Sequence, residues 1–111
     1  MEDCTFCKIV EGEMDTDLIY EDEKVIAFKD INPQAPVHIL IIPRKHISTL
    51  QDVEDYTIIE HIYKIANQLA NEYNIADDGY RVVVNCNDDG GQVVYHLHFH
   101  LLGGRKLKGL G

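Results

Sequence analysis

The 111-residue chain has no tryptophan, only three prolines and three cysteines, and 10 basic residues against 19 acidic ones. An odd number of cysteines argues against the disulfide framework of small secreted proteins. The formal net charge of −9 argues against binding to nucleic acid or to an anionic membrane surface, although local donors can still hold a small anion. No apolar run reaches the roughly 20 residues of a membrane-spanning helix. The acidic start, Met1-Glu2-Asp3, carries no signal-peptide pattern, so we expect a cytoplasmic protein.

What is present suffices for one folded domain. A chain of 111 residues, of which 45% are hydrophobic, can bury a core without disulfide bonds. There is no internal repeat, no low-complexity tract and no linker. We therefore expect residues 1–111 to form a single domain.

The spacing of apolar residues predicts five strands and two helices. Residues 5–11 are expected to form a short helix that Gly12 ends, and a long amphipathic helix is expected from about Asp52 to Tyr73. His61, on the polar side of that helix, is expected at the surface. Alternation and β-branched residues predict strands at 18–22, 24–30, 37–43, 80–85 and within 95–105. This order predicts an α+β fold, a five-stranded antiparallel sheet packed by helices.

Three of the six histidines occupy every second position of the segment YHLHFHLL (95–102). Successive side chains of a strand leave opposite faces, so His96, His98 and His100 should share one face. Imidazole nitrogens that are buried need polar partners or a ligand. The row indicates either a binding site or a solvent-exposed polar face.

The loop CNDDGGQ (86–92) directly precedes these histidines. Its two glycines are typical of a simple turn, but glycines also let successive N–H groups converge on an anion. Beside imidazoles, such donors suit the oxygens of a phosphate. The combination indicates a reaction in which a histidine attacks phosphorus and N–H groups stabilise the charge that develops.

The segment HLHFHLL (96–102) resembles the signature of the histidine triad family, in which three histidines alternate with apolar residues. The segments DINPQAPVHILIIPRKHIS (30–48) and GGQVVYHLHFHLLGGR (91–105) are similar to the nucleotide-binding branch of that family. The resemblance implies hydrolysis of a nucleoside 5′-monophosphate, expected to be AMP, from an amine or acyl leaving group. The reaction would pass through a covalent nucleotidyl-histidine.

The resemblance also implies roles for individual residues of this chain. His98 would be the nucleophile, His100 would contact the phosphate, and His38 would support them by hydrogen bonds. A carboxylate for the ribose, an amide, the phosphate loop and an apolar slot for the purine would bind the nucleotide: Asp30, Asn85, Gly91, Gln92, Val93, Phe6, Ile9, Phe28 and Ile31. Taken alone, the polar members of this set are typical turn residues and the apolar members typical core residues.

Position 93 departs from the pattern of the family, whose members often carry Ser or Thr there. The hydroxyl of those residues can hydrogen-bond the leaving nitrogen, whereas Val93 offers only its backbone N–H.

Cys4-x-x-Cys7 has the spacing of two metal ligands, but a tetrahedral zinc site needs two more. In some bacterial members of the family two histidines complete such a pair, which implies His46 and His96 here and a structural zinc ion. Two free thiols are the alternative; a thioredoxin-like redox pair fits poorly, because that motif follows a strand. Cys86 is expected to be an unpaired core residue.

The resemblance further implies a symmetric homodimer, in which the long helix and the strand starting at Tyr80 lie against their counterparts. A different class of function is also open, namely a nucleotide-binding or scaffolding protein whose catalysis is incidental. The intact triad of histidines favours the enzyme.

Overall fold

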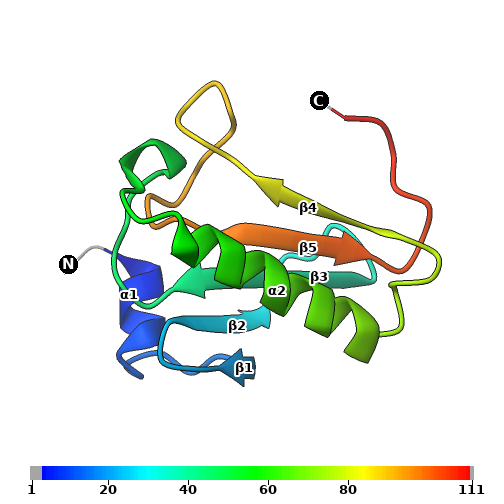
Figure 1. Ribbon diagram of the computed structural model, residues 1–111, viewed down its shortest axis with the longest axis horizontal. Coiled ribbons are helices and arrows are strands. Elements are labelled where there is room, and N and C mark those ends of the chain that lie inside the picture. Colours follow the sequence, from blue (N-terminus) through cyan, green and yellow to red (C-terminus); the bar gives the residue numbers. More distant parts are fainter. Residues whose placement is uncertain (1–3, 111) are drawn as a thin grey trace.

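A five-stranded antiparallel sheet forms the centre of the computed structural model, which describes residues 4–110. The strands lie in the order β1-β2-β3-β5-β4 (Figure 1). Their bounds are β1 Leu18–Glu21, β2 Val25–Lys29, β3 Val37–Pro43, β4 Tyr80–Val84 and β5 Phe99–Gly103. The helices are α1 (Thr5–Val10) and α2 (Thr57–Glu72). The α+β fold class with one long and one short helix is confirmed.

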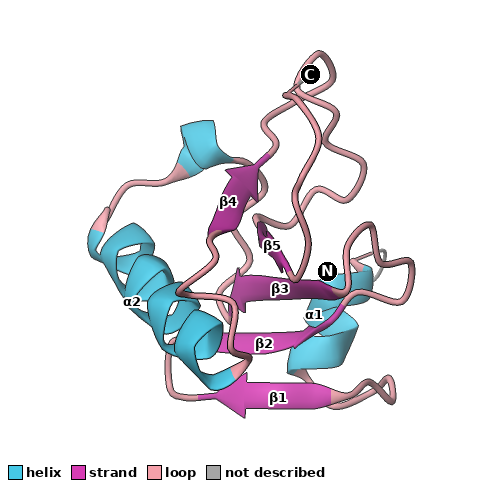
Figure 2. Ribbon diagram, turned by 90° about the vertical axis from the view of Figure 1, so that its right-hand side faces the viewer, coloured by secondary structure: helices cyan, strands magenta, loops and turns pink. Residues whose placement is uncertain are grey.

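The two helices cover opposite faces of the sheet, as Figure 2 shows. Val25 and Ala27 of β2 face α2 and belong to the larger core cluster. Ile26 and Phe28, the residues between and after them, face α1 and belong to a second cluster. The apolar run of β2 is thus explained by burial on both faces, which a strand with a single buried face would not require. None of the helices that the structure describes is long and apolar enough to cross a membrane.

The histidine segment is less regular than predicted, because β5 begins only at Phe99. Of the three alternating histidines, only His100 lies in a strand, and the prediction that all three do is wrong. Pairing between β3 and β5 ends at Ile41 and Phe99; beyond that point the N–H of Leu97 bonds instead to the carbonyl of Ile47, at 2.6 Å. Alternation nevertheless continues through the irregular part, where Leu97 joins the core beneath α2.

The long helix begins at Thr57 and not at the predicted Asp52. Asp52 ends a separate 3₁₀ turn, where its carboxylate accepts the N–H of Thr49 at 3.1 Å in a capping box. The carboxylate of Asp55 then accepts the N–H of Thr57 at 3.0 Å, at the start of α2. The acidic residues upstream therefore bond to the backbone at the start of a separate 3₁₀ turn and at the start of α2, two elements that hydrophobic periodicity alone predicts as one continuous helix.

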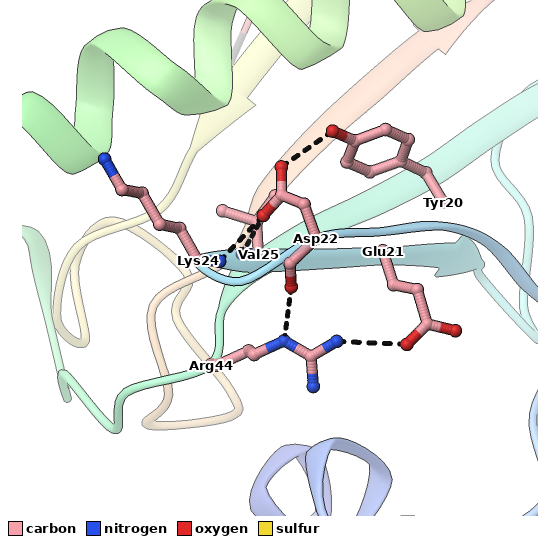
Figure 3. Close-up of polar contacts among 6 residues, drawn as sticks. All are labelled: Tyr20, Glu21, Asp22, Lys24, Val25 and Arg44. Carbon is pink, nitrogen blue, oxygen red and sulfur yellow. Dashed lines mark hydrogen bonds and ion pairs between the residues drawn. The ribbon is translucent and has the colours of Figure 1, made fainter.

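Asp22 organises the turn between β1 and β2, as Figure 3 shows. One carboxylate oxygen accepts the N–H groups of Lys24 and Val25 at 2.7 and 2.8 Å. The other accepts the hydroxyl of Tyr20 at 2.7 Å. The guanidinium Nε of Arg44, which follows β3, donates to the Asp22 carbonyl at 2.6 Å. The turn is thus tied to the neighbouring strand as well as to itself.

His61 joins the same carboxylate from α2. Its Nε2 lies 2.6 Å from Oδ2 of Asp22, and the ring is half-buried, so the expectation that His61 is a surface residue is wrong. Burial opposes ionisation of Asp22, but hydrogen bonds from Tyr20, Val25 and His61 outweigh it and hold the pKa of Asp22 well below its usual range. Helix and sheet are therefore joined by a hydrogen bond between His61 and Asp22 at the edge of the core.

Candidate active site

Three histidines converge on the α1 side of the sheet, where β3 and β5 are paired. His38 enters from β3 and His100 from β5, and their ring centroids lie 5.2 Å apart. His98, just before β5, places its ring centroid 5.0 Å from that of His100. His38 and His98 are buried and His100 is half-buried. The structure thus brings together the three residues predicted to be catalytic.

Hydrogen bonds fix which nitrogen of His38 and of His100 carries a proton. The backbone N–H of Gln34 donates to Nδ1 of His38 at 3.0 Å, so the neutral ring carries its proton on Nε2. That Nε2 lies 2.9 Å from Nδ1 of His100 and 3.4 Å from a carboxylate oxygen of Asp30. His100 therefore accepts at Nδ1 and presents an Nε2–H donor.

The tautomer of His98 is opposite. Its Nδ1 lies 2.8 Å from the backbone carbonyl of His96, and a carbonyl can only accept, so Nδ1 carries the proton. Nε2 of His98 consequently keeps a free lone pair. An imidazole held in this way is suited to act as a nucleophile.

Burial keeps these rings neutral. It lowers the pKa values of His38 and His98 from the ordinary value of 6.5. Burial and the neighbouring rings of His98 and His38 lower the pKa of His100 to about 4. At neutral pH the lone pair of the candidate nucleophile is therefore not lost to protonation.

The residues predicted to bind ribose and phosphate lie around these rings but already hold their own loops. Asp30 accepts the N–H of Asn32 at 2.9 Å. Asn85 donates its amide to the carbonyl of Gly90 at 2.7 Å. A side chain at Gly90 would place its Cβ 2.4 Å from a backbone oxygen, so only glycine fits this turn. Val93, at the end of the loop, is 87% exposed.

Gln92 differs from the rest of the predicted phosphate loop because its side chain is buried, with 6% exposed. Its Nε2 donates to the carbonyls of Ser48 and Val94 at 2.8 and 3.0 Å, and its Oε1 accepts the N–H of Asn87 at 2.9 Å. These bonds engage the whole amide. The side chain of Gln92 fixes the loop and is not free to bind a ligand.

The predicted apolar slot is assembled only in part. Phe6, Ile9 and Phe28 are buried in the cluster between α1 and the sheet. The ring of Phe6 stands edge-on to those of Phe28 and His98, with centroids 5.6 and 5.1 Å apart. Ile31 is 98% exposed in the turn after β2, so it lies outside this buried cluster.

A second group of side chains, adjacent to His98, could hold a metal ion: Cys4, Cys7, His46 and His96. Sγ of Cys7 lies 3.2 Å from Nδ1 of His46 and 3.4 Å from Nδ1 of His96. Sγ of Cys4 lies 3.3 Å from the same nitrogen of His96. A tetrahedron with the usual zinc bond lengths separates sulfur and nitrogen ligands by about 3.5 Å, so the donor set fits such a metal.

The orientation of His96 supports the same use. Its Nε2 lies 2.8 Å from the carbonyl of Pro43, so Nε2 carries the proton and Nδ1 faces the sulfurs with a lone pair. Burial and the adjacent sulfur of Cys4 raise the pKa of Cys7 to about 11, so this thiol favours its protonated form when no cation is near. Cys86 is free and only half-buried, so it is not the core residue that was expected.

Two contributors to these sites were not predicted from the sequence. Gln34 acts through its backbone N–H on His38, and no side-chain pattern indicates that. Ser48 accepts from Gln92 through its carbonyl, and its hydroxyl lies 3.2 Å from Nε2 of His46. The proximity of Ser48 to His46 in the sequence is the only signal that could have found it.

Comparisons of the sequence and of the structure with known proteins indicate the same family. The model of the HIT domain matches residues 11–107. The purine nucleoside phosphoramidase of Escherichia coli K12 is 48% identical over 108 residues, which cover 96% of this chain and 91% of that protein. A histidine triad protein from Clostridium difficile has a TM-score of 0.96 at 46% identity and covers 100% of this chain and 98% of its own. A HIT family hydrolase from Legionella pneumophila has a TM-score of 0.93 at 48% identity, with 96% of each chain covered.

Proposed function

The chain belongs to the HIT domain family, and from this premise we propose that it hydrolyses nucleoside 5′-phosphoramidates and related conjugates of AMP with an amine or acyl group. The observation that carries the proposal is the lone pair on Nε2 of His98, directed by the 2.8 Å bond from Nδ1 to the carbonyl of His96. A relative 48% identical to this chain is a purine nucleoside phosphoramidase, and a structural neighbour is a HIT family hydrolase.

The reaction has two displacements at phosphorus. In the first, Nε2 of His98 attacks, the bond from phosphorus to the leaving nitrogen breaks, and the amine takes a proton from water. In the second, water attacks phosphorus, loses a proton to solvent, and the bond to Nε2 breaks as AMP is released. The Nε2–H of His100 donates to a phosphoryl oxygen, and this contact strengthens as negative charge develops there.

The nucleotide would lie between α1 and the loop that precedes the triad. The carboxylate of Asp30 suits the two ribose hydroxyls, which are donors. The purine would enter beside Phe6 and Phe28, whose rings already pack edge-on at 5.6 Å. The backbone N–H of Val93 would face the phosphate, because the side-chain amide of Gln92 and the N–H of Gly91 are already bonded within the protein, the latter to the carbonyl of Asp88 at 2.9 Å.

We also propose that the metal ion at Cys4, Cys7, His46 and His96 is zinc. Two thiolates and two imidazoles are a donor set that zinc accepts in four-coordinate structural sites. When bound, the ion would fasten α1 to the segments that follow β3 and precede β5. Metal analysis of protein purified without chelators should find about one zinc per chain, and a content near zero would contradict the assignment.

The free cysteines of the described chain support a reducing, cytoplasmic location.

A symmetric homodimer is the proposed assembly. β4 is an edge strand, and all five of its residues are half-buried. An uncovered edge with three consecutive valines favours pairing with another strand, which a second copy can supply across a two-fold axis. Light scattering at micromolar concentration should give twice the mass of the chain, and a monomer mass would contradict the proposal.

The decisive experiment is incubation of the purified protein with adenosine 5′-phosphoramidate and measurement of AMP. We expect steady turnover, and we expect His98→Ala to abolish it while the affinity for AMP changes by less than about tenfold. His61→Ala, a histidine replaced on the other face of the sheet, is the matched control and should keep its activity. Tight binding without product would favour the nucleotide-binding or scaffolding protein instead.

A further inference from the structure

We propose that the metal cluster of Cys4, Cys7, His46 and His96 positions the nucleophile, in addition to fastening α1. A metal ion held by these residues would fix the tautomer of His98 and the conformation of the phosphate loop, so that metal occupancy controls the chemical step. The inference rests on the proposed metal site and the proposed hydrolysis. Two hydrogen-bonded paths lead from the cluster to the reacting residues.

The first path runs through His96. Its ring is fully buried, with Nδ1 facing the two sulfurs at 3.3 and 3.4 Å and Nε2 donating to the carbonyl of Pro43 at 2.8 Å. With both nitrogens engaged, the ring has one orientation. The backbone carbonyl of the same residue accepts Nδ1–H of His98 at 2.8 Å. His96 thereby links the metal ligands to the proton that leaves Nε2 of the nucleophile free.

The second path runs through the segment from His46 to Ser48. Nδ1 of His46 lies 3.2 Å from Sγ of Cys7. The next residue, Ile47, accepts the N–H of Leu97 at 2.6 Å, between the first and second histidines of the triad. Ser48 then accepts the amide of Gln92, which holds the phosphate loop, at 2.8 Å.

These two paths matter because the two segments that they connect lie outside the sheet. Residues 44–49 and 92–98 contain no strand, so they lack the ladder of hydrogen bonds that orders β3 and β5. The ligands of the cluster and the few contacts named above take the place of that ladder. Without a common metal, Nδ1 of His96 and of His46 lose their shared partner, and only the bond from Nε2 of His96 to the carbonyl of Pro43 still orients the His96 ring. The segment that carries the His96 carbonyl can then move away from Nδ1 of His98, which gives His98 access to the tautomer with its proton on Nε2.

If the metal ion only fastens α1 to the sheet, a different result is expected. Fastening α1 affects the apolar slot beside Phe6 and the overall stability, so its loss would raise KM and lower the melting temperature. Positioning of His98 affects kcat. The loss of one oriented hydrogen bond corresponds to a fall in kcat of at least about fivefold.

The test compares metal-loaded protein with protein stripped by a chelator, at a temperature where circular dichroism shows both to be folded. Protein labelled with ¹⁵N-histidine reports the tautomer of His98 by NMR, independently of activity. We expect a single Nδ1–H tautomer in the loaded protein and a mixture in the stripped protein, with kcat reduced as above. Added zinc should restore both. Cys7→Ser should resemble the stripped protein, whereas His61→Ala, which replaces a histidine outside the cluster and on the other face of the sheet, should resemble the loaded one.

The proposal is overturned if stripped, folded protein keeps the same His98 tautomer and kcat, or if the chain binds no metal. Unfolding of both the stripped protein and Cys7→Ser would also overturn it, since the cluster would then be a brace alone. Failure of the proposed hydrolysis is distinguishable, because the loaded protein would then release no AMP. The NMR spectra would still decide whether the tautomer of His98 depends on the metal ion.

Discussion

Replacing Gln92 with methionine separates two roles for the loop before the triad. The sequence interpretation makes Gln92 a ligand of the phosphate, whereas its buried amide bonds to Ser48, Val94 and Asn87 at 2.8 to 3.0 Å. Methionine has nearly the same length but neither donates nor accepts strongly, so Gln92→Met removes these bonds with little change in volume.

The size of the effect follows from the number of bonds. Each intramolecular hydrogen bond contributes about 1 kcal/mol net, so three of them contribute roughly 2 to 3 kcal/mol. In a domain of about 100 residues this lowers the melting temperature by on the order of 10 °C. Because the loop would no longer be held in one conformation, kcat/KM should fall by about tenfold or more.

The assays are thermal unfolding by circular dichroism and turnover of adenosine 5′-phosphoramidate. Gln68→Met is the matched control, since Gln68 lies exposed on α2 and its amide donates to Glu72 at 3.3 Å. Its change in stability should stay within about 0.5 kcal/mol. If Gln92→Met melts like the wild type and only KM rises, Gln92 contacts the substrate directly and the reasoning from its buried amide is refuted.

Three further predictions concern charge and the leaving group. Burial lowers the pKa of His100 to about 4, so as the pH falls this histidine is protonated in the unfolded chain before it is protonated in the folded one. The free energy of unfolding, measured in urea, should therefore fall as pH drops from about 6.5 to 4, and His100→Gln should reduce this dependence on pH. Asp22→Asn keeps only one acceptor oxygen, so it cannot accept both from the Tyr20 and His61 side chains and from the N–H groups of Lys24 and Val25, and it should cost about 1 to 2 kcal/mol at pH 7. Because the pKa of Asp22 is depressed, the difference from wild type should shrink as pH falls below 3.8, and a constant difference would contradict this. Val93→Ser restores a hydroxyl near the leaving nitrogen and should speed the most basic amine phosphoramidates by about fivefold, whereas an equal change across a series of amines would show that position 93 does not touch the leaving group.

The sequence predicted the faces of the elements better than their ends. β3 was predicted with its observed bounds because a run of apolar, mostly β-branched residues, interrupted only by His38, finishes at Pro43. The alternation in the histidine segment correctly separates Leu97 from the imidazoles, although regular pairing starts only at Phe99. Side-chain alternation depends on an extended backbone, whereas a strand also needs a paired neighbour, and a neighbour is a tertiary feature.

The candidate site was predictable as a set of side chains, and its chemistry was not. The alternation predicts that His98 and His100 share a face, and the resemblance to the histidine triad family adds His38 to them. The groups that decide which nitrogen carries the proton are the N–H of Gln34 and the carbonyl of His96. Backbone groups are identical at nearly every position, so no sequence pattern can show which of them will face an imidazole.

The three alternating histidines illustrate how one residue type acquires three roles. Each ring uses one nitrogen on a fixed partner: His96 on the carbonyl of Pro43, His98 on the carbonyl of His96, and His100 on the Nε2 of His38. The remaining nitrogen is then determined. It is an unprotonated Nδ1 facing sulfur in the first ring, an unprotonated Nε2 in the second and an Nε2–H donor in the third. Because the second ring depends on the backbone of the first, the proposed metal ligand and the proposed nucleophile cannot be exchanged by moving either along the chain, and their spacing of two residues is part of the proposed mechanism.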